Sequence, residues 1–354
     1  RKAAAEQLMP RGSQVTSALR DGLAHPDAEV RRQSRRLLAD RVKSELQLGI
    51  AELREGKEGA RVLNLPSWGR YRKEVGTTSD ARKLFSEMAT DEAALMFACQ
   101  AGGRVASKAA NARMRQVISG LYNRISTERR SPSRGTIAAV LFAVSHPDVE
   151  DEGGLLNGQW MSNLIRQSAF LTTLSSKTPS LASQKLVGLW LKADPDRQDL
   201  YRLQIAIPYG IKNEGLKLSM RVLADANAAA TNVVAQAIEG VARLGDKKYS
   251  KLFVPLLEDK RACGVRIVNK KRMQIQVQDI ALVWLIWSTG QQTSTYGYPT
   301  QAKTYLDRLK SNPTSITSTS YFYFGSEEKR KTAFKKWAEW VEKNPLPKLP
   351  PDAI

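Results

Sequence analysis

The sequence predicts an all-α protein, an α-solenoid of stacked helix pairs with one small inserted β-hairpin. Apolar residues at positions 231–246 recur at spacings of three and four, which places them on one face of a helix. The segment that ends at Asp225 corresponds to the segment that ends at Asp259, at an offset of 34 residues. A period of about 20–50 residues built on helix pairs is typical of an α-solenoid. At positions 261–278 the apolar residues alternate two by two instead, which is the period of a strand.

Helix ends carry their own signals. Gly245 is expected to end the helix that begins at residue 231, because a residue without a Cβ enters the left-handed region at little cost. Asp246 is expected to cap the following helix through its carboxylate, and Asp27 to cap the helix that begins at residue 28. The periodicity predicts helices over residues 14–23, 28–42, 45–55, 81–88, 91–100, 108–125, 137–144, 159–174, 181–192, 200–209, 213–224, 231–246, 248–259, 279–289, 302–310 and 326–343.

A hairpin is expected where the polar residues 269–272 separate the two alternating segments. A two-stranded ribbon is barely stable alone in water, so one of its faces must pack on the helices. Insertions in repeat proteins often lie on the binding face, so we predict that the tip residues Lys270, Lys271 and Arg272 contact a partner chain or an acidic surface. The alternative is a ribbon that covers the edge between two repeats. The side chains expected to pack inward are Val265, Ile267, Ile275 and Val277.

Several segments resemble parts of a HEAT repeat. Residues 241–246 followed by 254–259 resemble its junction, and residues 25–38 resemble its inner helix. Residues 276–282 are similar to the inner-helix pattern Val-Arg-Asp-Val-Ala-Leu, with Gln278 in place of the usual Arg. The whole chain resembles a group of bacterial HEAT-repeat proteins. Such families imply α-solenoid scaffolds that bind proteins, and they supply no catalytic residues.

The pattern divides the chain into four segments. The second interrupts the repeat and indicates a helical subdomain or cap, whose core would be anchored by Trp68, Tyr71 and Phe85. The fourth is rich in Ser, Thr and Tyr and ends in an amphipathic helix. The segments are 1–43, HEAT-like helices; 44–134, the subdomain; 135–290, a HEAT-like solenoid with the hairpin inserted at 261–278; and 291–354.

The net charge of +20 is uneven along the chain. Residues 1–134 carry 26 Lys and Arg against 15 Asp and Glu, a net of +11, whereas residues 135–256 carry 13 against 11, a net of +2. A basic surface attracts phosphates, anionic lipid or acidic proteins. The candidate cluster in the N-terminal third is Arg31, Arg32, Arg35 and Arg36, and the alternative is a solvated helix face.

The C-terminal helix is also basic, and it carries an apolar stripe of Phe334, Trp337 and Val341 with Trp340 beside it. Such a stripe beside lysines is found in helices that lie at a membrane surface. Packing on the preceding repeat is the more frequent arrangement, and we expect it here. No apolar run reaches the roughly 18 residues that a membrane span needs.

Nothing in the sequence indicates catalysis. His25 and His146 both lie in His-Pro-Asp turns, and no phosphate loop, nucleophile elbow or metal-spaced cluster accompanies them. Cys99 and Cys263 are expected to be free thiols. The acidic residues at 148–152 could collect calcium, although their spacing is not that of an EF-hand, and a solvated loop is the alternative.

The sequence therefore predicts a non-enzymatic scaffold that binds protein partners through a curved helical surface, as a subunit of a larger assembly, with no cofactor and no metal. The alternative is a protein that binds a polyanion, either nucleic acid or an anionic membrane surface, through its basic N-terminal helices. Nucleic acid is the weaker candidate, because no base-reading motif is present. The chain opens within a helical pattern at Arg1, so residues are expected upstream, and a cytoplasmic and a periplasmic location both stay open.

Overall fold

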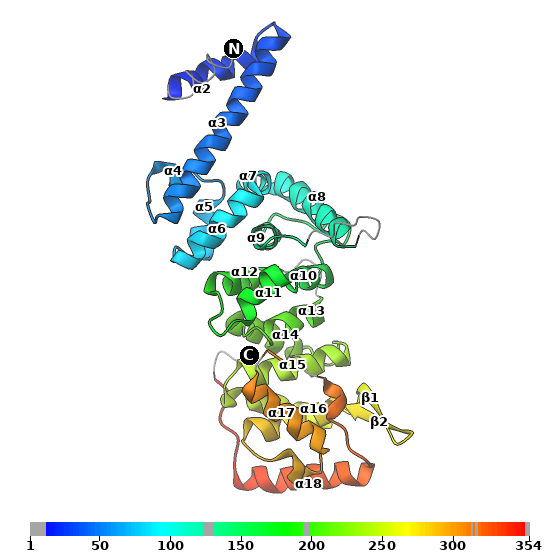
Figure 1. Ribbon diagram of the computed structural model, residues 1–354. Coiled ribbons are helices and arrows are strands. Elements are labelled where there is room, and N and C mark those ends of the chain that lie inside the picture. The colour runs from blue at the N-terminus through cyan, green and yellow to red at the C-terminus, as the bar shows by residue number, and fades with distance from the viewer. Residues whose placement is uncertain (1–11, 123–130, 194–197, 313, 316–317, 351–354) are drawn as a thin grey trace.

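The computed structural model describes residues 12–122, 131–193, 198–312, 314–315 and 318–350, with the backbone alone for residues 12–15. These residues form a long stack of helices with one two-stranded antiparallel sheet at its side (Figure 1). The predicted class, helical with one small hairpin, is confirmed. The helical pattern expected at Arg1 lies outside the described residues.

The N-terminal arm comprises α2 (Gly12–Asp21), the 3-10 turn η1 (Gly22–Ala24) and the first half of α3 (Ala28–Arg54), and it projects from the stack (Figure 1). Asp27 caps α3 as predicted, since its carboxylate accepts a 2.7 Å hydrogen bond from the backbone N–H of Glu29. The break expected after residue 42 is wrong, because α3 runs without interruption from Ala28 to Arg54, 27 residues in all. The residues at the expected break, Lys43 and Ser44, include no proline or glycine that would stop a helix. The predicted boundary between the first two segments therefore falls inside α3.

A block of five helices follows the arm. Trp68, Tyr71 and Phe85 anchor its core as predicted, with the Phe85 ring 4.9 Å from the Trp68 ring and 5.0 Å from the Tyr71 ring. All three side chains are buried, and the Tyr71 hydroxyl donates to the Ala81 carbonyl oxygen at 3.0 Å. The helices are α4 (Ala60–Leu63), α5 (Trp68–Glu74), α6 (Ser79–Asp91), α7 (Ala93–Ala101) and α8 (Gly103–Tyr122).

Six helices form the middle of the stack. The first, α9, is buried on every side from Gly135 to Val144 because its sequence is apolar all round. The single helix predicted over 159–174 is two helices, since the backbone of Gln167 is extended between them. The prediction for residues 181–192 agrees with α12 at both ends. The helices are α9 (Arg134–Val144), α10 (Gly158–Ile165), α11 (Ser168–Ser175), α12 (Leu181–Lys192), α13 (Asp199–Ala206) and α14 (Lys212–Ala224).

Helix α15 (Thr231–Leu244) buries the predicted apolar face, but the junction after it differs from the prediction. Gly245 has an extended backbone instead of a left-handed one; a Cβ there would lie 2.6 Å from the Val241 carbonyl oxygen, so the close approach requires glycine. Asp246 makes no capping hydrogen bond, and its carboxylate lies 3.7 Å from the Lys248 ammonium. The next element, η2 (Lys247–Glu258), is a 3-10 helix that contains Pro255, not the predicted α-helix.

The hairpin consists of β1 (Ala262–Val268) and β2 (Lys271–Gln276), joined by a two-residue loop. The register pairs Ile275 with Gly264, Gln274 with Val265 and Arg272 with Ile267. Directly paired residues share a face, so Val265 and Ile267 lie on the face opposite Ile275. The prediction that they pack inward is wrong: Val265 and Ile267 are 40% and 72% exposed, whereas Ile275 and Val277 are buried.

The C-terminal part of the chain packs around the apolar helix α16. Arg330 of the last helix reaches Asp279 of α16 with two hydrogen bonds, of 2.8 and 3.0 Å, and both side chains are buried. The partner of the Asp279 carboxylate therefore comes from 51 residues downstream in the chain. The elements are α16 (Val277–Ser288), η3 (Thr293–Tyr296), α17 (Thr300–Ser311), η4 (Thr319–Tyr321) and α18 (Glu327–Lys343).

The stripe of α18 packs on the helices before it, as expected. Trp337 is 3% exposed, and Phe334, Trp340 and Val341 are partly buried against the same core. Among the described helices, none combines the length and apolar character needed to cross a membrane.

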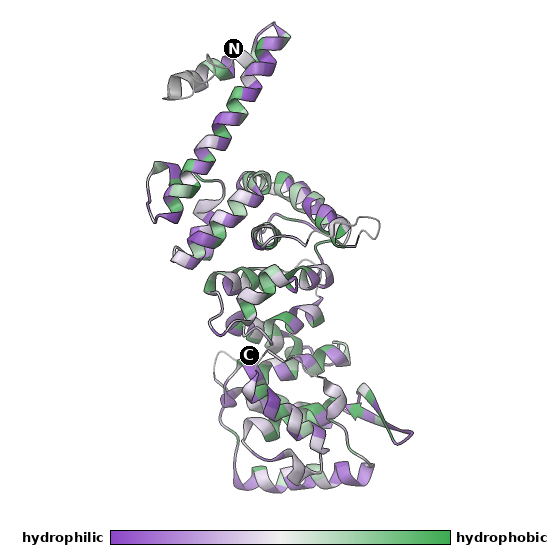
Figure 2. Ribbon diagram, viewed as in Figure 1, coloured by the Kyte–Doolittle hydropathy of each residue, from purple (hydrophilic) through white to green (hydrophobic). Residues whose placement is uncertain are grey.

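Two apolar cores hold the stack together. One joins α3–α9 with α10–α14, and the other joins α15 and η2 with α16, α17 and α18. They meet at α14 and α15, where Leu216 and Leu223 touch both. The packing is thus continuous across the boundaries predicted at residues 134 and 290. Figure 2 shows hydrophobic residues concentrated inside the stack and hydrophilic ones at the tip of the hairpin.

Candidate binding surfaces

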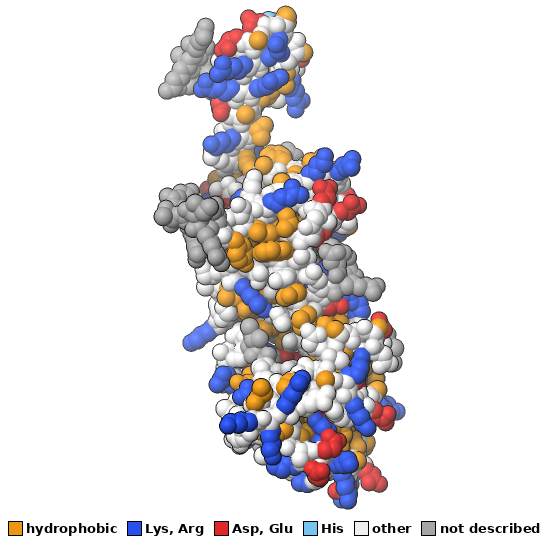
Figure 3. All heavy atoms as spheres, turned by 90° about the vertical axis from the view of Figure 1, so that its right-hand side faces the viewer, with side chains coloured by type: hydrophobic (Ala, Val, Ile, Leu, Met, Phe, Trp, Pro, Cys, Tyr) orange, Lys and Arg blue, Asp and Glu red, His pale blue; other side chains and the backbone are white. Residues whose placement is uncertain are grey.

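The arginine cluster predicted in the N-terminal third lies on the projecting half of α3. Arg32, Arg35 and Arg36 are exposed, and Arg36 lies 3.9 Å from Asp40. Arg31 is turned back, because its guanidinium donates to the carbonyl oxygens of the His-Pro turn at 2.8 and 2.6 Å. Figure 3 shows Lys and Arg side chains gathered over this arm. Three of the four predicted arginines thus form an open basic surface, and the fourth stabilises the turn.

A groove runs between the arm and the block behind it. Its volume is about 590 Å³, within the range of roughly 300–1,000 Å³ typical of binding pockets. Most of its walls are apolar, and Leu23, Val42 and Phe97 are 36%, 50% and 43% exposed. The lining residues are Thr16, Arg20, Leu23, Leu38, Arg41, Val42, Glu45, Leu46, Ala60, Arg61, Asn64, Leu65, Pro66 and Phe97. Nothing in the sequence predicts this groove, because its residues come from α2, η1, α3, α4, α7 and the loop after α4, which only the fold brings together.

Arg41 gives the groove an unpaired cation. Its Nη1 is buried and has no hydrogen-bond partner among the described residues. Arg61, by contrast, is occupied by Glu52 at 2.7 Å and Glu45 at 3.3 Å. A buried donor without an acceptor is costly, so the groove favours an occupant that brings one.

The hairpin presents the second predicted basic surface. Lys270, Lys271 and Arg272 are exposed at its tip, as predicted. Asn269 and Lys270 both have positive φ, at 49° and 62°, as a type I′ turn requires. The free face of the ribbon carries Val265 and Ile267 beside these cations.

The arm and the hairpin do not form one site. The arm projects from one end of the stack, and the hairpin leaves it near α15 and α16 towards the other end (Figure 1). A single compact ligand cannot touch both surfaces, whereas an extended partner or two partners can.

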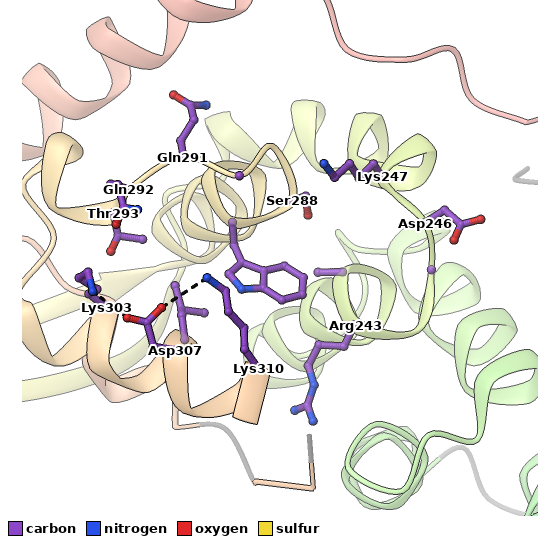
Figure 4. Close-up of a pocket in the computed structure, with 15 residues that line it drawn as sticks. Arg243, Asp246, Lys247, Ser288, Gln291, Gln292, Thr293, Lys303, Asp307 and Lys310 are labelled. Carbon is purple, nitrogen blue, oxygen red and sulfur yellow. Dashed lines mark hydrogen bonds and ion pairs between the residues drawn. The ribbon is translucent and has the colours of Figure 1, made fainter. Parts of the chain in front are cut away.

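A third candidate is a polar pocket that no sequence pattern predicts. It lies where α15 and α16 end against α17, and its volume is about 460 Å³ (Figure 4). Lys303, Lys310 and Asp307 line one wall, with Asp307 accepting at 2.8 Å from Lys303 and at 3.4 Å from Lys310. The pKa of Asp307 is lowered, chiefly by the Lys303 hydrogen bond. No local signal could reveal this pocket, because the residues that meet there are spread along the chain.

A buried ion pair contributes Arg243 to the wall of the pocket. The Arg243 guanidinium donates to Glu239, one turn earlier on α15, and to the Ser315 carbonyl oxygen at 3.3 Å. Glu239 is 2% exposed and also accepts from Gln236 at 2.9 Å. Burial raises the pKa of Glu239 to about 7, against the lowering effect of Arg243.

The acidic loop at 148–152 is bound to α8 by polar contacts. Ser107 donates to the Asp148 carbonyl oxygen at 3.1 Å and accepts from the Glu150 N–H at 2.9 Å. Oδ1 of Asp151 accepts from the backbone N–H groups of Leu155 and Leu156 at 2.9 and 3.1 Å, whereas its Oδ2 is buried without a hydrogen-bond partner among the described residues. Within the described residues, no group of three or more His, Cys, Asp or Glu side chains is placed to hold a metal ion.

The two His-Pro-Asp turns share one geometry. The backbone N–H of Asp27 donates to Nδ1 of His25 at 3.1 Å, and that of Asp148 donates to Nδ1 of His146 at 3.2 Å. Both histidines therefore stabilise turns. Cys99 and Cys263 are free thiols as expected, and burial raises their pKa values to about 11 and about 12.

No family model, curated protein or solved structure matches this chain.

Proposed function

We propose that the protein is a non-enzymatic scaffold, a subunit of a larger assembly that binds a protein partner in the groove beside the N-terminal arm. The observation that carries the proposal is the buried Nη1 of Arg41, which has no partner among the described residues, within a mostly apolar groove. Large apolar side chains line the groove at exposures of 36–50%. An exposed apolar patch rimmed by polar residues is typical of protein interaction sites.

The occupant we propose is an amphipathic helix from an acidic protein. Helix-in-groove recognition places an apolar stripe against a hydrophobic groove. Here Leu23, Val42 and Phe97 would receive that stripe, and a carboxylate of the partner would accept from Arg41. The exposed Arg32, Arg35 and Arg36 further along the arm would attract the same acidic segment.

We further propose that the stack is an α-solenoid of HEAT-like pairs. Helices that follow one another in sequence pack together, as α14 on α15 and α15 on α16. Asp225 and Asp259, the residues of the 34-residue correspondence, each follow the last residue of a helical element. A solenoid would give the assembly an extended surface on which several partners could bind.

The test is affinity purification from the native source with matched variants. Val42→Asp puts a charge into the groove, and Arg41→Gln removes the unpaired cation. Val105→Asp is the control, because Val105 is 56% exposed on α8 and does not line the groove. We expect one protein to be retained in stoichiometric amount by the native chain and by Val105→Asp, and to be lost from both groove variants.

Two further measurements identify the occupant. Amide exchange on the purified complex should protect the groove and an acidic helical segment of the partner. Sedimentation of the isolated chain should show a monomer; a dimer that Val42→Asp dissociates would mean that a second copy fills the groove, and would overturn the proposal. Equal loss from Val105→Asp would also contradict it.

The exposed Arg32, Arg35 and Arg36 support a second candidate function, polyanion binding. Binding of a DNA duplex, measured at two salt concentrations, decides it. Phosphate contacts require a steep loss of affinity with salt and a shallower slope when the three arginines become serine. Serine at Lys329, Lys331 and Lys335 of α18 is the matched control, and an equal effect there would show only nonspecific charge.

A further inference from the structure

We infer that the polar pocket between α15, α16 and α17 binds a small organic ligand that carries a phosphate group. The site is independent of the groove, because the two lie on different helices of the stack and share no lining residue. Its volume of about 460 Å³ suits a ligand of metabolite size.

The pocket holds more cations than its acids neutralise. Four basic side chains line it, Arg243, Lys247, Lys303 and Lys310, against two acids, Asp246 and Asp307. Arg243 is held by Glu239 and the Ser315 carbonyl oxygen, and Lys303 and Lys310 share Asp307. Asp246 lies 3.7 Å from Lys248, which is not a lining residue.

Lys247 is therefore the surplus charge, with no carboxylate within ion-pair distance among the described residues. In Figure 4 Lys247 and Lys310 lie on opposite sides of the pocket, while Asp246 points away from it. An anion between these two lysines would interact with both ammonium groups. It would also give Lys310 an anionic partner of its own, because Asp307 accepts from Lys303 as well as from Lys310.

The Trp287 indole supplies a second, independent indication of a missing acceptor. Its Nε1 is buried, yet it has no hydrogen-bond partner within the described chain. An indole N–H can only donate, so an acceptor must come from a ligand or from water. Trp287 is also one of the residues that line the pocket with the surplus lysine.

The set of donors favours phosphate over carboxylate. A phosphate monoester has three terminal oxygens, so it offers one acceptor for each of the three donors, Lys247, Lys310 and the Trp287 N–H. A carboxylate has two oxygens and would leave one of these donors less well matched. The buried Ser288 and Thr293 line the same pocket and add hydroxyl groups.

The remainder of the pocket suits an apolar or planar group. The Trp287 ring, Leu306 and Ala242 form apolar wall next to the cations. Both α15 and α16 end at the pocket, and the partial negative charge of their C-terminal ends offsets part of the lysine charge. We therefore expect moderate affinity that depends on both halves of the ligand.

Calorimetry with four probes tests the inference: phenyl phosphate, inorganic phosphate, benzoate and benzyl alcohol. Phenyl phosphate should bind at least about tenfold more tightly than each of the other three, a factor that corresponds to about 1.4 kcal/mol. No heat from phenyl phosphate into the millimolar range would overturn the inference. If benzoate bound as tightly as phenyl phosphate, the phosphate assignment would be wrong. If inorganic phosphate bound as tightly as phenyl phosphate, the proposed apolar group of the ligand would be wrong.

Three variants locate the binding. Lys310→Gln should weaken phenyl phosphate about tenfold, and Trp287→Phe, which keeps a ring but loses the N–H, several-fold. Lys310 is 65% exposed, so its loss should leave the melting temperature unchanged. Lys270→Gln at the hairpin tip is the control for charge alone. An equal loss of affinity in Lys270→Gln would place the ligand elsewhere and contradict the site.

Discussion

Glu239 is the residue whose ionisation should be visible in the stability of the whole chain. Its folded pKa of about 7 lies above the ordinary value of 4.5, chiefly because it is buried. Between these two values the folded protein holds a proton that the unfolded chain releases. The contribution of Glu239 to the free energy of unfolding therefore falls as pH rises from 4.5 to about 7, by at most about 1.4 kcal/mol per pH unit.

Glu239→Gln removes this dependence, because glutamine does not ionise. The stability of the variant relative to the native chain should rise with pH across the same window, whatever the constant cost of changing the Arg243 contact. Urea unfolding at several pH values measures it. Asp307→Asn, in the polar pocket between α15, α16 and α17, is the control. Its stability relative to the native chain should not rise between pH 4.5 and 7, because the pKa of Asp307 is lowered from 3.8. A pH-independent difference for Glu239→Gln would show that Glu239 is ionised throughout.

Single-residue predictions succeeded where the interaction is local. Asp27 caps α3 because the acceptor and the N–H that it binds are two residues apart. The Lys247 ammonium and the Trp287 indole N–H have no partner within the described part of the chain, and this could not be predicted, because it depends on helices brought together by the fold. Arg41 is a similar case: the sequence shows a basic residue on a helix, and only the groove shows that its Nη1 lacks an acceptor.

At the scale of elements, the hairpin shows how the length of its loop decides which side chains of the two strands share a face. The sequence suggested a four-residue tip, and the structure has a two-residue loop. With a loop of two or of four residues, an odd-numbered residue of one strand pairs with an even-numbered residue of the other. Val265 and Ile267 therefore cannot lie on the same face of the ribbon as Ile275. Helix positions were better predicted, since the apolar spacing of α12 and α15 reports burial directly. The continuity of α3 was missed, although Lys43 and Ser44 include no residue that would stop a helix.

Lys270→Gly should stabilise the hairpin by roughly 0.5–1 kcal/mol. Lys270 has φ of 62°, where a side chain costs energy and glycine does not, and the added freedom of the unfolded chain offsets part of the gain. Amide exchange in β1 and β2 should slow. Lys271→Gly loses the same charge from a strand position and should speed exchange instead. Faster exchange in both variants would mean that the turn carries no strain at Lys270.

At the scale of the whole molecule, the stack divides by packing and not by sequence pattern. The predicted subdomain at 44–134 shares one core with the middle helices, and the Ser/Thr/Tyr-rich segment shares the other with α15 and α16. The sequence pattern separates these segments because it depends only on residues that are close together in the chain. The cores follow long-range contacts instead, such as Tyr71 against Phe142 at 5.7 Å and Trp284 against Phe322 at 6.2 Å.

The two cores should respond separately to damage. Trp337→Ala empties a site that is 3% exposed in the C-terminal core, and it should cost about 3–5 kcal/mol. Because few contacts link that core to α9 and α12, amide exchange should accelerate in α16, α17 and α18 and stay slow in α9 and α12. Phe142→Ala, fully buried in the other core, is the matched change and should give the reverse pattern. Equal acceleration at both ends of the stack would show that the chain opens as one cooperative unit, with α14 and α15 coupling the halves too tightly for either to open alone.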